Sequence, residues 1–179
     1  GFYASEHGEL FVGIDPRKEN HPIYEEQAEF YKKHSTFFEN EKRHELICQP
    51  AEDVDLSKYE GMMDIVFTSP PYFDTEKYSD EPTQSYIKYP TEDKWIDGFL
   101  FETMKNCYES LKKNGYLLLN IANTSSGKSI EKATLDISKG FGLVHEKTLQ
   151  LTLSSVMGAG YKYEPIYVFK KSGEWLKWN

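Results

Sequence analysis

The sequence lacks any apolar run long enough to cross a membrane. Among its 179 residues, no hydrophobic stretch approaches the roughly 20 residues that a bilayer-spanning helix needs. The first residues do not have the pattern of a secretory signal either. We therefore expect a cytoplasmic protein without a membrane partner.

Cysteine is also scarce. The two cysteines, Cys48 and Cys107, lie far apart in the chain and show no metal-binding spacing, and neither do the five histidines. Each cysteine is in an apolar stretch, which predicts two reduced side chains in the core. No metal site is expected.

Basic residues are outnumbered by acidic ones. The chain has 21 Lys and Arg against 29 Asp and Glu, a formal net charge of -8, and its pI is about 5.2. Tight non-specific binding to nucleic acid depends on Lys and Arg that neutralise phosphates. The composition counts against such binding, although an acidic body can still carry a basic cleft.

What the chain does have is a regular alternation of apolar strands and helical segments. Its length suits one domain. Continuous apolar strands between helices predict an α/β sandwich with a mainly parallel sheet. Strands are predicted at Glu9–Ile14, Glu45–Cys48, Met62–Phe67, Tyr116–Ile121, Val144–Leu153 and Pro165–Lys170, and helices at Glu19–His34, Glu92–Lys113 and Ser129–Lys139.

Ligands bind at the carboxyl ends of the strands in such sheets. The residues that directly follow the strands are therefore the candidates for a site: Asp15, Gln49–Asp53, Thr68–Tyr72 and Ala122–Thr124. The aperiodic segment Phe73–Pro90 is predicted to be a long loop, and loops of this length are usually either functional or disordered. Its basic and aromatic residues fit either a wall that contacts nucleic acid or a Tyr-rich lid.

The strongest signal is the segment Asp64–Tyr72, in which an apolar strand leads to Ser69, Pro70, Pro71 and Tyr72. An exocyclic amine is a poor nucleophile because its lone pair is delocalised into the ring. The Ser69 hydroxyl and the Pro70 carbonyl can accept its two hydrogens. The two prolines fix the backbone, and the Tyr72 ring offers a face on which an extruded base can stack. The alternative is a Pro-Pro turn that ends a strand.

The segment Thr68–Tyr72 resembles motif IV of the amino-methyltransferases, the family of N6-adenine and N4-cytosine DNA methyltransferases. Asn114–Asn120 and Tyr163–Lys170 are similar to later strands of that family. The resemblance implies a Rossmann-like class I methyltransferase sandwich with an antiparallel last strand. It also implies S-adenosyl-L-methionine (AdoMet) as cofactor and DNA as substrate, with Ser69, Pro70, Pro71 and Tyr72 as catalytic residues. Asn120 and Asn123 fit either an active-site role or a capping role.

The cofactor-binding residues expected from the resemblance are Asp15, Pro16, Glu52 and Thr68. Asp15 ends the strand Glu9–Ile14, and an acidic residue at this place can accept hydrogen bonds from both ribose hydroxyls. Glu52 lies in the turn that faces the adenine. A plain turn at Asp15 and a solvated acidic loop at Glu52 remain open.

The chain departs from the family at its beginning, where no segment before Phe11 matches the family's first strand and Gly-rich loop. Since the chain starts with Gly1 and not Met, we expect residues 1–179 to be a single catalytic domain without this strand. The family's strand order is 3-2-1-4-5-7-6, so the strands that end at Asp15 and Phe67 would each have an unpaired edge. Direct closure, filling by the residues before Phe11, and a strand from a homodimer partner are possible responses; closure or exchange is favoured.

Two other functions fit the same residues. One is N-methylation of an RNA base or a protein amide, since related folds use similar motifs. The other is a non-catalytic module that acts through a partner.

Overall fold

The chain divides into two compact units. The computed structural model describes residues 2–34, 42–73, 77, 80–123, 129–153 and 162–172. The N-terminal unit is Gly1–Val54 and the C-terminal unit is Asp55–Asn179. The composition near Val54 shows no linker, so this division was not predicted. No helix in the described ranges is long and apolar enough to span a bilayer.

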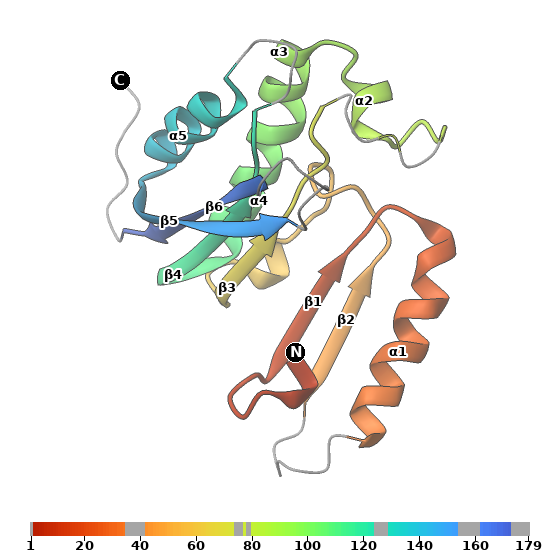
Figure 1. Ribbon diagram of the computed structural model, residues 1–179. Coiled ribbons are helices and arrows are strands. Elements are labelled where there is room, and N and C mark those ends of the chain that lie inside the picture. Colours follow the sequence, from red (N-terminus) through yellow and green to blue (C-terminus); the bar gives the residue numbers. More distant parts are fainter. Residues whose placement is uncertain are drawn as a thin grey trace. The chain divides into compact units, whose positions relative to one another are not determined.

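The N-terminal unit is a two-stranded parallel sheet with a crossover helix. β1 (Leu10–Ile14) pairs with β2 (Arg43–Ile47), and α1 (His21–His34) lies between them in the chain (Figure 1). Parallel strands need such a crossover because a short turn cannot join them. The predicted strand–helix–strand order is confirmed. Residues before β1 include a 3₁₀ turn, η1 (Phe2–Ala4), and they do not form the additional strand that was one of the open arrangements.

The C-terminal unit contains a four-stranded sheet in the order β3-β4-β6-β5. β3 and β4 are parallel, and β6 is antiparallel to both of its neighbours. The predicted α/β class with an antiparallel last strand is thus confirmed. The elements of this unit are η3 (Ser57–Tyr59), β3 (Met63–Thr68), α2 (Ser85–Lys88), α3 (Glu92–Lys94), the π-helix η4 (Trp95–Leu100), α4 (Phe101–Ser110), β4 (Leu111–Asn120), α5 (Ile130–Phe141), β5 (Leu143–Leu153) and β6 (Lys162–Lys171).

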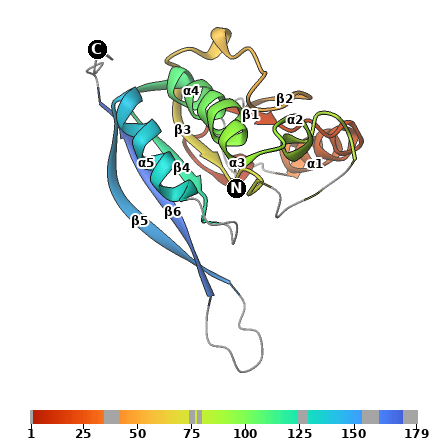
Figure 2. The ribbon, with the colours of Figure 1, turned by 90° about the horizontal axis from the view of Figure 1, so that it is seen from above.

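The two sheets have the strand orders β2-β1 and β3-β4-β6-β5. The first matches strands 3-2 of the family order given above, and the second matches strands 4-5-7-6. In the described part of the chain, β1 and β3 each pair with one strand only. Beyond β4, residues 150–153 of β5 pair with residues 162–165 of β6, so these strands continue as a two-stranded ribbon (Figure 2).

Helices α4 and α5 lie over one face of the four-stranded sheet (Figure 1). The apolar side chains on one face of the helical region from Trp95 to Tyr108 are buried. They pack against Leu117, Leu119 and Phe169 of the sheet. They are Trp95, Phe99, Met104 and Tyr108, and Leu111, the first residue of β4, is buried in the same cluster.

Apolar side chains of β3 remain exposed. Ile65 and Phe67 are 64% and 62% exposed. Their partners in the register are Tyr116 and Leu118, so they alternate with the positions of the buried Leu117 and Leu119. Strands of parallel sheets are normally covered on both faces. This part of β3 is therefore an apolar surface of the C-terminal unit.

Two helix ends differ from the prediction. The helical segment from Glu92 ends at Ser110, before the predicted end at Lys113. There, the Lys171 ammonium donates to the Tyr108 and Leu111 carbonyls at 2.7 and 2.8 Å. α5 continues past Lys139, the predicted end, and is capped by Gly142 with φ of 76°. Of the two glycines near this end, Gly140 and Gly142, it is Gly142 that has the left-handed conformation favoured at a helix C-cap.

The prediction that both cysteines are buried is half wrong. Cys107 is buried in α4, and burial raises the pKa of its thiol to about 12. Cys48 is exposed because it follows the end of β2, where its Sγ lies 3.7 Å from the Pro16 carbonyl oxygen.

Candidate active site at the carboxyl ends of the strands

The parallel pairing of β3 with β4 brings Ser69 to Asn120. Thr68 lies opposite Leu119, so the residues that follow them are neighbours at the carboxyl edge. Ser69 Oγ donates a hydrogen bond to Asn120 Oδ1 at 3.1 Å. Asn120 is buried, and its Nδ2 donates to the Pro165 carbonyl on β6 at 3.0 Å.

This pair of hydrogen bonds has a fixed direction. A backbone carbonyl can only accept, so the Nδ2 group of Asn120 must face Pro165 and its Oδ1 must face Ser69. The Ser69 hydroxyl therefore uses its one hydrogen inside the protein. Its remaining lone pairs can only accept hydrogen bonds from a ligand.

Tyr72 is partly buried and packs against the core of the C-terminal unit. Its hydroxyl donates to Glu164 Oε2 on β6, at 3.4 Å. Pro70 is buried and Pro71 is half-buried. The structure thus places Asn120 and Glu164 beside the predicted motif. The sequence alone leaves the role of Asn120 open and gives no signal for Glu164, because only strand pairing brings them to this edge.

Asn123 caps α5. Its Oδ1 accepts from the Glu131 amide at 3.0 Å, and its own amide donates to Glu131 Oε1 at 3.3 Å. The other carboxylate oxygen of Glu131 accepts from the Tyr167 hydroxyl at 2.6 Å. Burial and this hydrogen bond raise the pKa of Tyr167. The network fixes the chain after β4 at the candidate site; Thr124 lies outside the described residues.

Asp15 follows β1 in the N-terminal unit and already accepts several hydrogen bonds. Its Oδ1 accepts from the Arg17 amide at 2.7 Å, and its Oδ2 accepts from the Tyr24 hydroxyl at 2.8 Å. Asn20 Nδ2 is 3.5 Å from the same Oδ2. The hydrogen bond to Asp15 and partial burial raise the pKa of Tyr24. This network is built within one turn and the first turns of α1.

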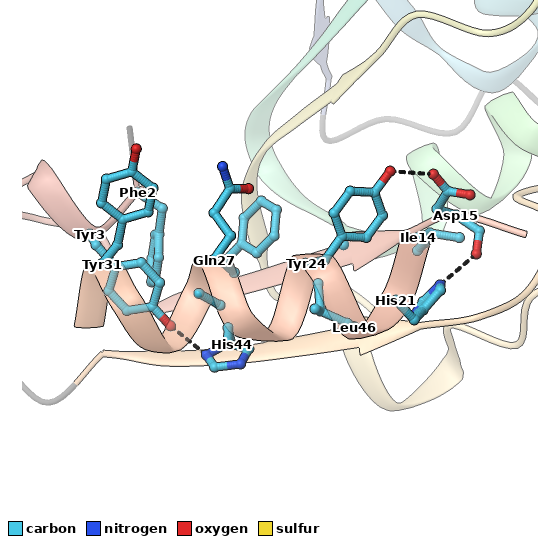
Figure 3. Close-up of a pocket in the computed structure, with 13 residues that line it drawn as sticks. Phe2, Tyr3, Ile14, Asp15, His21, Tyr24, Gln27, Tyr31, His44 and Leu46 are labelled. Carbon is cyan, nitrogen blue, oxygen red and sulfur yellow. Dashed lines mark hydrogen bonds between the residues drawn. The ribbon is translucent and has the colours of Figure 1, made fainter. Parts of the chain in front are cut away.

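A cavity of about 580 Å³ lies in the N-terminal unit beside Asp15 (Figure 3). Asp15, His21 and Tyr24 line one end, and the aromatic rings of Phe2 and Tyr3 line the other. The cavity is therefore polar at the carboxyl end of β1 and mainly aromatic farther away.

Two of the other three predicted cofactor residues lie at strand ends too. Pro16 follows Asp15 and is half-buried, and Thr68 is the last residue of β3. Glu52 is buried, so it is not the solvated acidic side chain that the sequence left open.

The segment before α4 does not have the charge of a phosphate-binding wall. Lys77 and Lys88 lie over the rings of Tyr86 and Tyr89, at 5.4 and 5.2 Å from the centroids. Within residues 80–97 the acidic side chains outnumber the basic ones. They are Asp80, Glu81, Glu92, Asp93 and Asp97, against Lys88 and Lys94. Across the described ranges, no cluster of His, Cys, Asp and Glu is suited to hold a metal ion.

Solved structures with a similar fold are AdoMet-dependent methyltransferases. One, from Methanosarcina mazei, has a TM-score of 0.55 at 11% identity, with 96% of both chains covered. A candidate DNA modification methylase from Thermus thermophilus has 0.51 at 17% identity, over 73% of this chain and 55% of that one. The magnesium protoporphyrin IX methyltransferase of Synechocystis, solved with its cofactor bound, has 0.51 at 16% identity, over 92% and 61%. The fold is thus the Rossmann-like fold of AdoMet-dependent methyltransferases, as predicted.

The family is shown by the sequence itself. A DNA methylase family profile matches residues 63–179, well over half of the chain and including the whole of β3 and the motif after it. The chain belongs to this DNA methylase family, whose methyl donor is AdoMet. No curated protein is similar enough to count as a match.

The residues of the N-terminal unit fit one part of AdoMet. The Asp15 carboxylate has lone pairs beyond those used by Arg17 and Tyr24, because a carboxylate offers about four acceptor positions. The aromatic cavity next to it suits the adenosyl group. The sequence before Phe11 has no Gly-rich loop for the methionyl part.

The first prediction concerns Tyr167. Since its pKa is raised on folding, the unfolded chain loses the hydroxyl proton at a lower pH than the folded chain. Stability should therefore fall as the pH rises through about 10, the pKa of an unperturbed tyrosine. Tyr167→Phe should remove the part of this loss that Tyr167 contributes, while costing about 1 kcal/mol at neutral pH for the hydrogen bond.

Urea unfolding at about pH 8 and about pH 11, on either side of that pKa, measures the effect. Tyr163→Phe on the same strand, at an exposed position, is the matched control. An equal stability difference between wild type and Tyr167→Phe at both pH values would contradict the prediction.

Proposed function

We propose that this protein transfers a methyl group from AdoMet to an exocyclic amino group of a DNA base, cytosine N4 or adenine N6. The observation that carries the proposal is the hydrogen-bonded chain from Ser69 through Asn120 to Pro165. Because the Ser69 hydroxyl gives its hydrogen to Asn120, it can only accept a hydrogen bond from a ligand. The Pro70 carbonyl beside it can also only accept. An amino group, which has two N–H donors, is the ligand that matches these two acceptors.

Each residue of the motif then has a defined task. Ser69 Oγ and the Pro70 carbonyl accept the two amine hydrogens, which concentrates the nitrogen lone pair perpendicular to the base plane. Pro70 and Pro71 hold these acceptors in place. The Tyr72 ring stacks on the extruded base. AdoMet supplies an electrophilic methyl group; the amine nitrogen forms the new bond, the sulfur keeps the electrons of the old one, and a proton then leaves the nitrogen.

The cofactor is assigned to the other predicted residues. Asp15 accepts from the ribose hydroxyls, with Pro16 and Glu52 in the same unit; Thr68, at the end of β3, is the residue assigned in the C-terminal unit. The Asp15 network supports this assignment because a carboxylate held by the Arg17 amide and the Tyr24 hydroxyl is already oriented before the ligand arrives.

A protein amide or an RNA base is the second candidate substrate. Both offer the same two N–H donors to Ser69 and Pro70. A protein amide is favoured by the excess of acidic residues in the segment 80–97, which does not suit contact with phosphates. The first experiment therefore compares DNA, RNA and glutamine-containing peptides as methyl acceptors. No transfer to any of them would favour the non-catalytic alternative.

The second prediction tests the amine site. Ser69→Ala removes one acceptor and should lower kcat about tenfold, the factor expected for one lost hydrogen bond. Asn120→Leu should have a similar effect, because Ser69 could then turn its hydrogen toward the amine. Tyr72→Ala should lose stacking of about 1–3 kcal/mol and so raise KM.

Transfer of a labelled methyl group to single-stranded oligonucleotides provides kcat and KM for each variant. Ser57→Ala, at an exposed position of η3, is the serine control. Normal turnover in both Ser69→Ala and Asn120→Leu would refute the proposed site.

The third prediction concerns Asp15. Asp15→Ala should weaken AdoMet binding, as measured by calorimetry, with little change in the circular dichroism spectrum. Tyr24→Phe should weaken binding less than Asp15→Ala, since the Arg17 amide still orients the carboxylate. Glu26→Ala is the control, because Glu26 is an exposed acidic residue of the same unit that does not line the cavity. Unchanged affinity in Asp15→Ala would leave Asp15 with a role in the turn only.

The fourth prediction concerns the homodimer that the sequence suggests. The exposed Ile65 and Phe67 lie on β3, which pairs with one strand only in the part of the chain that is described. Such an apolar edge strand recruits other chains. Light scattering after size exclusion should show self-association, and Phe67→Ser should reduce it more than Ile23→Ser, a control on the exposed side of α1. A wild-type monomer at every concentration tested would contradict the homodimer.

A further inference from the structure

Phe73, the residue after Tyr72, has a backbone conformation that aromatic residues rarely adopt. Its φ is 41°, in the left-handed region where the Cβ of an L-residue is crowded. A residue keeps such a conformation only where its surroundings hold it, and such positions are frequent at functional sites. The structure should therefore contain an anchor for Phe73.

That anchor is Trp95. The two rings meet edge to face with their centroids 6.5 Å apart, and the Trp95 side chain is fully buried. The indole Nε1 of Trp95 donates to Ser85 Oγ at 3.3 Å. Ser85 is the first residue of α2. One side chain thus contacts both the residue after Tyr72 and the start of the next helix.

Trp95 also begins the π-helix η4, a wide and rare turn that often marks functional sites. Gly98 in this turn faces Tyr89, because a methyl group at Gly98 would lie 2.2 Å from Cε1 of that ring. The same turn therefore holds both ends of the segment 85–89. Ser85 is held through Trp95, and Tyr89 is held against Gly98.

Tyr72 and Phe73 have different partners although they are consecutive. The Tyr72 hydroxyl reaches Glu164 on β6, whereas the Phe73 ring reaches Trp95 in η4. We propose that Trp95 is a positioning residue for Tyr72: by holding Phe73 it fixes the direction of the Tyr72 ring. Through its hydrogen bond to Ser85, Trp95 also fixes the position of the segment 85–89 relative to Phe73. The proposal rests on the proposed function, in which Tyr72 contacts the base and Trp95 does not.

The first test follows Tyr72 directly and needs no enzymatic activity. The full chain is labelled with ¹³C in its tyrosine rings, and the Tyr72 signal is identified by its loss in Tyr72→Phe. Trp95→Leu should shift or broaden this signal. Trp95→Phe, which keeps a ring against Phe73, should restore it. Phe141→Leu is the control, since Phe141 is buried but packs on Phe101 and Tyr108 instead.

An unchanged Tyr72 signal in folded Trp95→Leu would overturn the proposal. If Trp95→Leu does not fold, Phe73→Ala takes its place, because it removes the same contact from the other side. The Tyr72 signal should then move as well, and an unchanged signal would again overturn the proposal.

The second test separates this proposal from the proposed function. Trp95→Leu should raise KM for an oligonucleotide about tenfold, within the range expected for lost base stacking, and Phe141→Leu should not. If Tyr72→Ala raises KM but Trp95→Leu does not, the positioning role of Trp95 is refuted and the function stands. If Tyr72→Ala leaves KM unchanged, the assigned function of Tyr72 fails, and the ¹³C signal alone decides on Trp95.

Discussion

The register between β3 and β4 is the constraint on which the candidate site depends. Thr68 lies opposite Leu119, so Ser69 and Asn120 meet at the carboxyl edge. The antiparallel register of β4 with β6 places Asn120 opposite Ile166, which brings the Pro165 carbonyl within reach of its amide. A slip of one residue would turn the Asn120 side chain to the other face of the sheet. The registers of β3, β4 and β6 therefore determine that the Ser69 hydroxyl donates to Asn120 and can only accept from a ligand.

Much of the fold could be predicted because it is encoded locally. Continuous apolar runs identify β3 and β4, and the near-helical spacing of Trp95, Phe99 and Met104 identifies the buried helix face. The end of α5 could not be decided in this way. Gly140 and Gly142 are equally good stop signals, and the choice falls on Gly142 because Phe141 packs on Phe101 and Tyr108 and extends the helix to that point.

The motif Ser69–Tyr72 of the candidate site could be predicted from the sequence, but the residues that contact the motif could not. Ser69 to Tyr72 are contiguous, so their chemistry can be read from the sequence. Asn120 and Glu164 are distant in the chain, and strand pairing alone assigns them to the same edge. The conformation of Phe73 is equally invisible in the sequence, since an aromatic residue predicts a negative φ. The environment of β3 shows a related limit: its composition is that of a buried strand, yet Ile65 and Phe67 are exposed in the described part of the chain.

The two polar groups assigned to ligands share one principle of construction, in which the protein binds one side of a group and leaves the other side for the ligand. The Asp15 carboxylate is oriented by the Arg17 amide and the Tyr24 hydroxyl and has further lone pairs for a ligand. Ser69 donates its hydrogen to Asn120, so only its oxygen lone pairs face a ligand. Under the proposed function this has a consequence for the product. A primary amine fills both acceptors, Ser69 Oγ and the Pro70 carbonyl, whereas a monomethylated amine has one N–H left. One acceptor then loses its partner, so the monomethylated product makes one hydrogen bond fewer at the site. The hydrogen-bond pattern that matches a primary amine therefore matches the product less well than the substrate.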